Sequence, residues 1–161
     1  MVFFDTCIWI ELCCTTVPQN ASQKVQAQKA SQLLTDVLQK NEQIVTCNEQ
    51  LLEIISAIQK VKMRAYNKSN KPGVGQLKEY RATPDFVSAQ KLCTQAVADV
   101  TQLSIKCELQ PYKISDVLAQ LHLIDMNDYL YYQHCVAKKI DFYTFDGDFA
   151  NLGAVPQVHI L

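Results

Sequence analysis

The sequence predicts a three-layer α/β/α domain with a central parallel β-sheet. Short apolar runs alternate along the chain with longer amphipathic segments, which is typical of strands that are each followed by a helix. The chain has 161 residues and no long linker or internal repeat, so we expect a single domain over residues 1–161. Apolar residues make up 48% of it, which is enough for a sizeable core without a disulfide or metal.

The first half of the chain predicts strands and helices in alternation. An apolar run at its start ends at Asp5, and helical spacing of apolar residues follows. Two longer amphipathic segments carry leucine, isoleucine and valine on one face. In order, we expect a strand over residues 2–4, a helix over 6–12, a helix over 22–40, a strand over 43–46 and a helix over 48–66.

The second half begins with a stretch that favours a loop, because residues 67–83 contain Pro72 and two glycines with almost no apolar residues. Periodicity then returns, and Asp146-Gly147-Asp148 is typical of a tight turn. In order, we expect a helix over residues 84–103, a strand over 107–109, helices over 114–121 and 125–138, a strand over 140–145 and a strand over 157–161.

Composition excludes several classes of protein. The net charge of -1 excludes a uniformly basic nucleic-acid coat, and the 4 glycines form neither a dinucleotide-binding nor a Walker phosphate loop. The 7 cysteines contain no C-x-x-C pair, which is typical of a reducing compartment rather than of a disulfide framework or zinc ribbon. The apolar N-terminus lacks a basic leader and is interrupted by Asp5 and Glu11, so we expect a cytoplasmic protein without membrane contact.

Acidic residues fall where ligands bind in open parallel sheets, just beyond the carboxyl ends of strands. Each alone has an ordinary structural interpretation, as a helix cap, a dipole-favoured acid or a turn residue. If they meet, carboxylates 4 Å apart repel by about 4 kcal/mol per pair at an effective dielectric constant of 20, so the cluster needs a cation. An all-oxygen set favours Mg²⁺ or Mn²⁺ over zinc and indicates phosphodiester hydrolysis. These acids are Asp5, Glu53, Asp128, Asp146 and Asp148.

Segments that cover about half of the chain resemble the PIN domain family of metal-dependent nucleases, which includes VapC-type toxins. VFFDTCIWIEL is similar to the opening strand of the family and its first aspartate, here Asp5. IVTCNEQLLEIISAI contains the helix glutamate, which is Glu53 or, one turn earlier, Glu49. IDMNDYLYYQHCVAKKIDFYTFDGDF is similar to the C-terminal signature, an aspartate that starts a helix and then a strand that ends in T-x-D-x-D-F; it contains Asp128, Thr144, Asp146 and Asp148.

The resemblance implies an Mg²⁺- or Mn²⁺-dependent ribonuclease whose product carries a 5′-phosphate. Asp5, Asp128 and Asp146 would hold the metal directly or through water, with Asp148 assisting from the edge. Glu53 would orient or deprotonate the attacking water. The supporting residues would be Thr6, Asn127 and Thr144. The resemblance also implies that the protein could be the toxin of a toxin–antitoxin pair, bound by an antitoxin protein and able to form a homodimer. The alternative is a PIN-like module without catalytic activity that binds RNA or protein.

Residues 67–113 match none of these motifs and form an atypical basic loop and helix. Residues 60–81 hold seven Lys or Arg side chains against Glu79 alone, so 7 minus 1 gives a net charge of +6. Such a segment is either a track for RNA phosphates or an ordinary solvated surface. Its candidate nucleic-acid contacts are Lys60, Arg64, Lys68 and Lys71, with Tyr66 and Tyr80 as candidates for stacking on bases.

Overall fold

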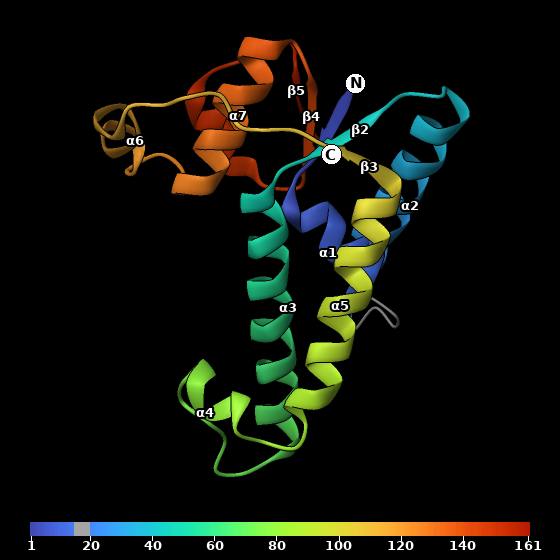
Figure 1. Ribbon diagram of the computed structural model, residues 1–161, viewed down its shortest axis with the longest axis vertical. Coiled ribbons are helices and arrows are strands. Elements are labelled where there is room, and N and C mark those ends of the chain that lie inside the picture. The colour runs from blue at the N-terminus through green and yellow to red at the C-terminus, as the bar shows by residue number, and fades with distance from the viewer. Residues whose placement is uncertain (15–19) are drawn as a thin grey trace.

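The computed structural model describes residues 1–14 and 20–161, and it confirms the α/β class. Its five strands form one all-parallel sheet in the order β3-β2-β1-β4-β5, with helices on both faces (Figure 1). The strands are β1 (Val2–Phe4), β2 (Ile44–Thr46), β3 (Ser104–Lys106), β4 (Asp141–Thr144) and β5 (Val158–Ile160).

Helices of the first part of the chain cover one face of the sheet, and those of the last part cover the other. The first face carries α1 (Thr6–Cys14), α2 (Ala21–Gln39), α3 (Asn48–Ser69) and α5 (Phe86–Leu103). The second carries α6 (Ile114–Gln120), α7 (Met126–Lys138) and the 3₁₀ helix η1 (Gly147–Leu152). The short helix α4 (Leu77–Arg81) caps the far end of α3 (Figure 1).

Strand β1 lies in the middle of the sheet and is buried on both faces. Val2 and Phe4 belong to the core under α1, α2, α3 and α5, whereas Phe3 belongs to the core under α7. This is the alternation that the pleat of a strand imposes. Trp9 of α1 packs on Phe4 with a ring-centroid distance of 5.4 Å. The residue that follows β1, Asp5, is therefore held at the centre of the sheet edge.

The strand order creates a switch point between β1 and β4. From β1 the chain moves outward through β2 to β3, and it then returns across the other face to β4 and β5. Ligands of open parallel sheets bind where the connections separate to opposite faces, beyond the carboxyl ends of the strands. Figure 1 shows the first turns of α1, α3 and α7 close together at this edge.

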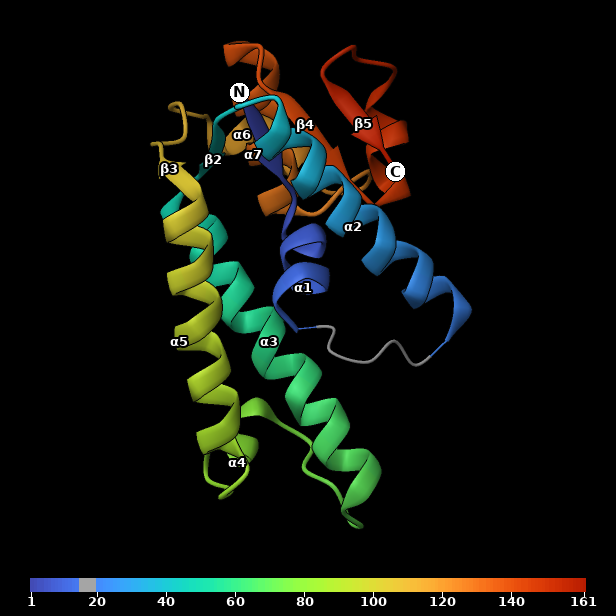
Figure 2. The ribbon, with the colours of Figure 1, turned by 90° about the vertical axis from the view of Figure 1, so that its right-hand side faces the viewer.

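Helices α3 and α5 pack side by side and extend well beyond the sheet, and the connection between them contains α4, which packs on α3 (Figures 1 and 2). The predicted loop over residues 67–83 is therefore partly wrong, because α3 continues to Ser69 and α4 follows. Glu79 Oε2 accepts hydrogen bonds from the backbone N–H groups of Gly75 and Gln76, at 2.8 and 3.1 Å, which caps α4. The burial of Tyr80 anchors it.

The third strand is also displaced from its predicted position. It runs over Ser104–Lys106 rather than 107–109, directly after α5. Pairing with β2 fixes this register, since Thr46 lies opposite Lys106 and the Thr46 carbonyl accepts the Cys107 N–H at 2.7 Å. As an edge strand with mostly exposed side chains, β3 lacks the apolar run that marks the central strands.

The remaining predicted elements agree with the structure to within a few residues at their ends. All seven cysteines are free. Among the described residues, no helix combines the length and the apolar character needed to cross a lipid bilayer.

Candidate active site

Asp5 is the most buried carboxylate of the site, with 4% of its surface exposed. Its Oδ1 accepts the Thr6 N–H at 2.6 Å, and its Oδ2 accepts the Thr144 hydroxyl at 2.5 Å and the Cys7 thiol at 3.1 Å. Burial raises the pKa of Asp5, and these three donors oppose the rise. The carboxylate is thus held in one orientation at the end of β1.

Thr144 connects the ends of β1 and β4. It is fully buried, and its hydroxyl donates to Asp5 while accepting the Asp146 N–H at 2.9 Å. Asp146 in turn caps η1, since its Oδ1 accepts the Asp148 N–H at 2.8 Å. One hydroxyl therefore fixes the position of Asp146 relative to Asp5.

Glu53 reaches the same edge from the second turn of α3. Its Oε2 accepts the Tyr131 hydroxyl of α7 at 2.8 Å. Burial raises the pKa of Glu53, with the Asp5 charge adding to the rise, while hydrogen bonding from Tyr131 and the Asn127 side chain oppose it. Glu53 therefore joins α3 to the first turns of α7.

Gln50, one turn before Glu53, anchors α3 to the sheet. It is fully buried; its Oε1 accepts the Thr46 hydroxyl at 2.7 Å and its Nε2 donates to the Phe4 carbonyl at 2.6 Å. Both partners lie at the carboxyl ends of strands, next to Asp5. The Gln50 amide therefore fixes the position of the first turn of α3 relative to the end of β1.

Asp128, in the first turn of α7, lies within electrostatic range of the other acids of the site. Burial, followed by the charges of Asp5, Glu53 and Asp146, raises its pKa to about 8. The carboxylates of Asp5, Glu53, Asp146 and the helix neighbour Asp125 all act on Asp128, so these acids lie near one another at this edge of the sheet. We call Asp5, Glu53, Asp128 and Asp146 the acidic cluster.

Among the residues that the structure describes, no Lys, Arg or His side chain forms an ion pair with the acidic cluster. Within residues 1–14 and 20–161 the ion pair found is His159 with Asp141, on β5 and β4 outside the cluster. The Thr6 hydroxyl is near enough to Glu53 to lower its pKa. Yet this buried oxygen makes no hydrogen bond of good geometry with any described residue. An uncompensated cluster of oxygens beside an unpartnered hydroxyl is a suitable environment for a hard divalent cation.

The described side chains do not form a ready-made cage. Within those residues, no three His, Cys, Asp or Glu side chains are placed to hold one ion together. Mg²⁺ commonly keeps several waters and takes only one or two protein carboxylates. The donor set therefore fits Mg²⁺ or Mn²⁺ that retains part of its water shell.

The structure brings together most of the predicted site residues. Thr6, Asn127 and Thr144 accompany the acidic cluster. Asp148 is exposed and contacts the site through its backbone N–H. Between the two candidate glutamates, Glu53 is in the cluster, whereas Glu49 is exposed and its charge acts on Cys47 and Cys107.

The predicted nucleic-acid contacts lie away from the cluster. Lys60, Arg64 and Lys68 are exposed along α3, and Lys71 is exposed in the segment after it. The stacking role predicted for Tyr80 is wrong, because its ring is fully buried against Tyr66 and Phe86 and its hydroxyl donates to Asp85 at 2.7 Å. A buried ring has no face to offer a base.

Sequence patterns did not identify Tyr131, Gln50 or Cys7 as part of the site. The aromatic run around Tyr131 predicts core packing with the hydroxyls at the rim, which is correct for the buried ring but does not identify Glu53 as the partner of the hydroxyl. One signal was present: Tyr131 lies three residues after Asp128, on the same face of the helix.

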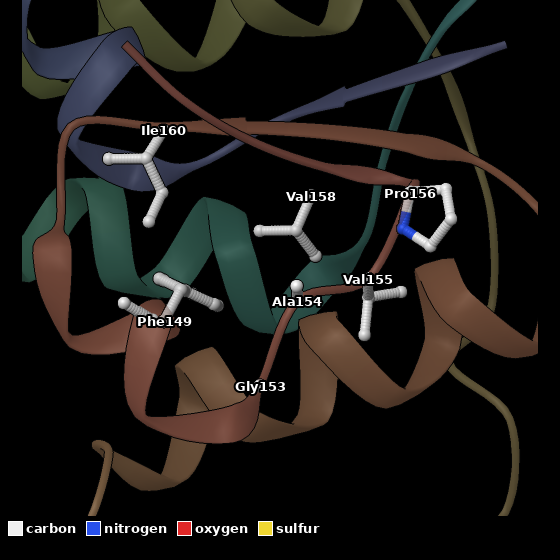
Figure 3. Close-up of a pocket in the computed structure, with 8 residues that line it drawn as sticks. Phe149, Gly153, Ala154, Val155, Pro156, Val158 and Ile160 are labelled. Atoms are coloured by element: carbon white, nitrogen blue, oxygen red, sulfur yellow. The ribbon is translucent and has the colours of Figure 1, made fainter.

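A separate apolar hollow of about 540 Å³ lies beside β5 (Figure 3). Its lining contains no acid or other charged side chain, so it is distinct from the acidic cluster. The lining residues are Phe149, Ala150, Gly153, Ala154, Val155, Pro156, Val158 and Ile160.

Comparison with known proteins identified no relative of this chain. No protein-family model matches the sequence, no curated protein matches it, and no solved structure matches the fold. The resemblance to the PIN domain family therefore stays a prediction.

Proposed function

We propose that the protein is an Mg²⁺- or Mn²⁺-dependent endoribonuclease with the acidic cluster as its active site. The observation that carries this proposal is the gathering of carboxylates from β1, α3, α7 and the end of β4, with which no Lys, Arg or His side chain among the described residues forms an ion pair. Such a cluster is stable at neutral pH when a divalent cation shares it.

In this proposal Asp5, Asp128 and Asp146 hold the ion, directly or through water, with Asp148 at the exposed edge. The ion would polarise the phosphodiester and offset the charge that develops on it. Glu53 accepts the proton of the attacking water, and the Tyr131 hydroxyl holds its carboxylate in place through Oε2. Thr144 keeps Asp5 and Asp146 in register with each other.

RNA as the substrate, and a product with a 5′-phosphate, follow from the resemblance of the motifs to PIN domain nucleases. The same resemblance supports a role as the toxin of a toxin–antitoxin pair, restrained by an antitoxin protein, and a homodimer. The seven free cysteines are consistent with a cytoplasmic location for this activity.

The proposal is tested by cleavage of a mixed-sequence RNA in Mg²⁺, Mn²⁺ or EDTA. Wild type, Asp5→Asn and Glu53→Gln are compared with Glu49→Gln, which removes the same charge from the same helix outside the acidic cluster. We expect metal-dependent cleavage by wild type and Glu49→Gln, and a loss of at least about 100-fold in the other two, because their groups act on the reacting atoms.

Circular dichroism shows whether each variant is folded. Absence of cleavage by folded wild type in either metal would overturn the proposal and favour the alternative, a PIN-like module that binds RNA or protein without cutting it. Equal activity of Glu49→Gln and Glu53→Gln would remove Glu53 from the site.

A further inference from the structure

Helix α3 carries a row of positive charge on the same side of the helix as Glu53, beginning about two turns beyond it. At 100° per residue, Lys60 and Arg64 lie within about 20° of Glu53 around the helix axis. Both side chains are exposed. At 1.5 Å per residue, they lie about 10 Å and about 16 Å from Glu53 along the axis. Lys68 follows one turn later, about 40° farther round.

The row faces away from α1 and α5, which pack along α3. Ile54 and Ile58 face the core shared with α1, about 100° and 140° from Glu53. Ile55 and Gln59 line the groove against α5. Helix α3 extends beyond the sheet (Figure 2), and Lys60 and Arg64, in its second half, are both exposed.

The charge on this stretch is of one sign. After Glu53, the next acidic residue in the chain is Glu79, and six lysines and arginines lie between them. A row of cations on one helix face, with no acid among them, is suited to a polyanion whose charges repeat along a line.

We infer that α3 is the binding track for a single strand of RNA, which runs from the acidic cluster past Lys60 and Arg64. The inference rests on the proposed function, because the strand enters the active site at Glu53. The track lies on one side of the acidic cluster, so it binds nucleotides on only one side of the cut. At 3.4 Å per stacked nucleotide, 16 Å corresponds to about five nucleotides, and to fewer in an extended strand.

Lys62 provides a matched control on the same helix. It lies about 180° from Glu53 around the axis, on the side of α1. Burial raises the pKa of the Cys14 thiol of α1, and the Lys62 charge partly opposes that rise, so the two side chains are close. Lys62→Gln therefore removes one positive charge from α3, as Lys60→Gln does, but at a position outside the track.

Binding is measured first, by fluorescence anisotropy of a labelled single-stranded 12-nucleotide RNA in EDTA, where hydrolysis is stopped. For Lys60→Gln/Arg64→Gln we expect Kd to rise roughly threefold to tenfold and the salt slope of log Kd to fall by about 1.4, the value for two lost contacts to a single strand. Lys62→Gln should bind as wild type does. Equal binding by the double variant and Lys62→Gln would overturn the track.

Cleavage then tests the one-sided geometry. Oligoribonucleotides that share a mapped cut site are extended by five nucleotides on the 5′ side, on the 3′ side or on neither. We expect only one of the two extensions to lower KM, with kcat changed little. The double variant should not show this decrease in KM, whereas Lys62→Gln should show it as wild type does. A gain from both extensions, or from neither, would overturn the inference. Weaker binding by the double variant with no cleavage by wild type would instead overturn the proposed function and leave the track standing.

Discussion

The Tyr131 hydroxyl donates a 2.8 Å hydrogen bond to Glu53 Oε2 and so ties α7 to α3 across the acidic cluster. The two residues are 78 positions apart in the chain. The phenol is fully buried, so this hydroxyl has few alternative partners. Because the bond occupies one carboxylate oxygen, it sets the direction of the other.

Tyr131→Phe is expected to lower kcat for RNA cleavage roughly tenfold, because a hydrogen bond to a charged group contributes about 1.5–3 kcal/mol. KM should be nearly unchanged, because this hydrogen bond orients Glu53 without contacting RNA. Tyr129→Phe is the matched control, since Tyr129 is a buried phenol on the same helix whose hydroxyl accepts from Gln133. Steady-state kinetics on one RNA substrate separate kcat from KM. An equal fall in both variants would indicate a general packing effect instead.

Thr144→Val is expected to lower the free energy of unfolding by about 1–3 kcal/mol, because it leaves the Asp146 N–H without its partner and removes a donor from Asp5. Thr144→Ser keeps the hydroxyl and should retain most of the stability and the cleavage rate. Urea denaturation and initial rates provide both readouts. Loss of activity in the serine variant as large as in the valine variant would argue against a hydroxyl bridge.

The metal-free protein should lose stability as pH rises from about 4 to about 8. Burial and the neighbouring acids raise the pKa of Asp128 from 3.8 to about 8, so the folded state binds this proton more tightly than the unfolded state does. Between those two pH values, folding must hold a proton that the unfolded chain has released, and unfolding becomes progressively easier.

Thermal melts in EDTA across this pH range check the effect. Asp128→Asn should flatten the pH dependence, whereas Asp116→Asn, which alters an exposed acid of α6, should leave it as in wild type. Mg²⁺ should raise the melting temperature more at pH 8 than at pH 5, because binding to the folded state competes with the proton. A melting temperature of the metal-free wild type that rises with pH in parallel with Asp128→Asn would contradict the raised pKa.

Gln50→Met should destabilise the fold by about 1–3 kcal/mol, since it leaves the buried Phe4 carbonyl and Thr46 hydroxyl without partners. A double-mutant cycle with Thr46→Val isolates the shared bond, and the two losses should be less than additive. Urea denaturation provides the free energies. Strict additivity would mean that the Thr46 hydroxyl and the Gln50 amide do not interact.

The central elements of the fold could be predicted from the sequence because each has a strong local signal. Val2-Phe3-Phe4 is apolar on both faces, as a central parallel strand requires. The edge strand β3 has no such signal, since pairing with β2 rather than side-chain pattern fixes its register. Helix α4 likewise depends on Glu79 capping and Tyr80 burial, which composition alone does not reveal.

The candidate site divides along the same line. The acids could be located because they follow strands or begin helices, where parallel sheets gather ligands. Their partners could not, because Tyr131 and Gln50 act through contacts between distant elements. Periodicity places Tyr131 in the core but does not show where its hydroxyl points.

The most direct test of the acidic cluster as a divalent-cation site is a Mn²⁺ titration followed by electron paramagnetic resonance, which detects free Mn²⁺. Wild type should bind Mn²⁺ at the acidic cluster, which decreases the signal of free Mn²⁺. Asp5→Asn and Asp128→Asn should weaken binding at least about tenfold, as expected for loss of a ligand. Glu49→Gln should bind Mn²⁺ as wild type does. Binding that is absent from folded wild type, or that is equal in all four proteins, would contradict the account.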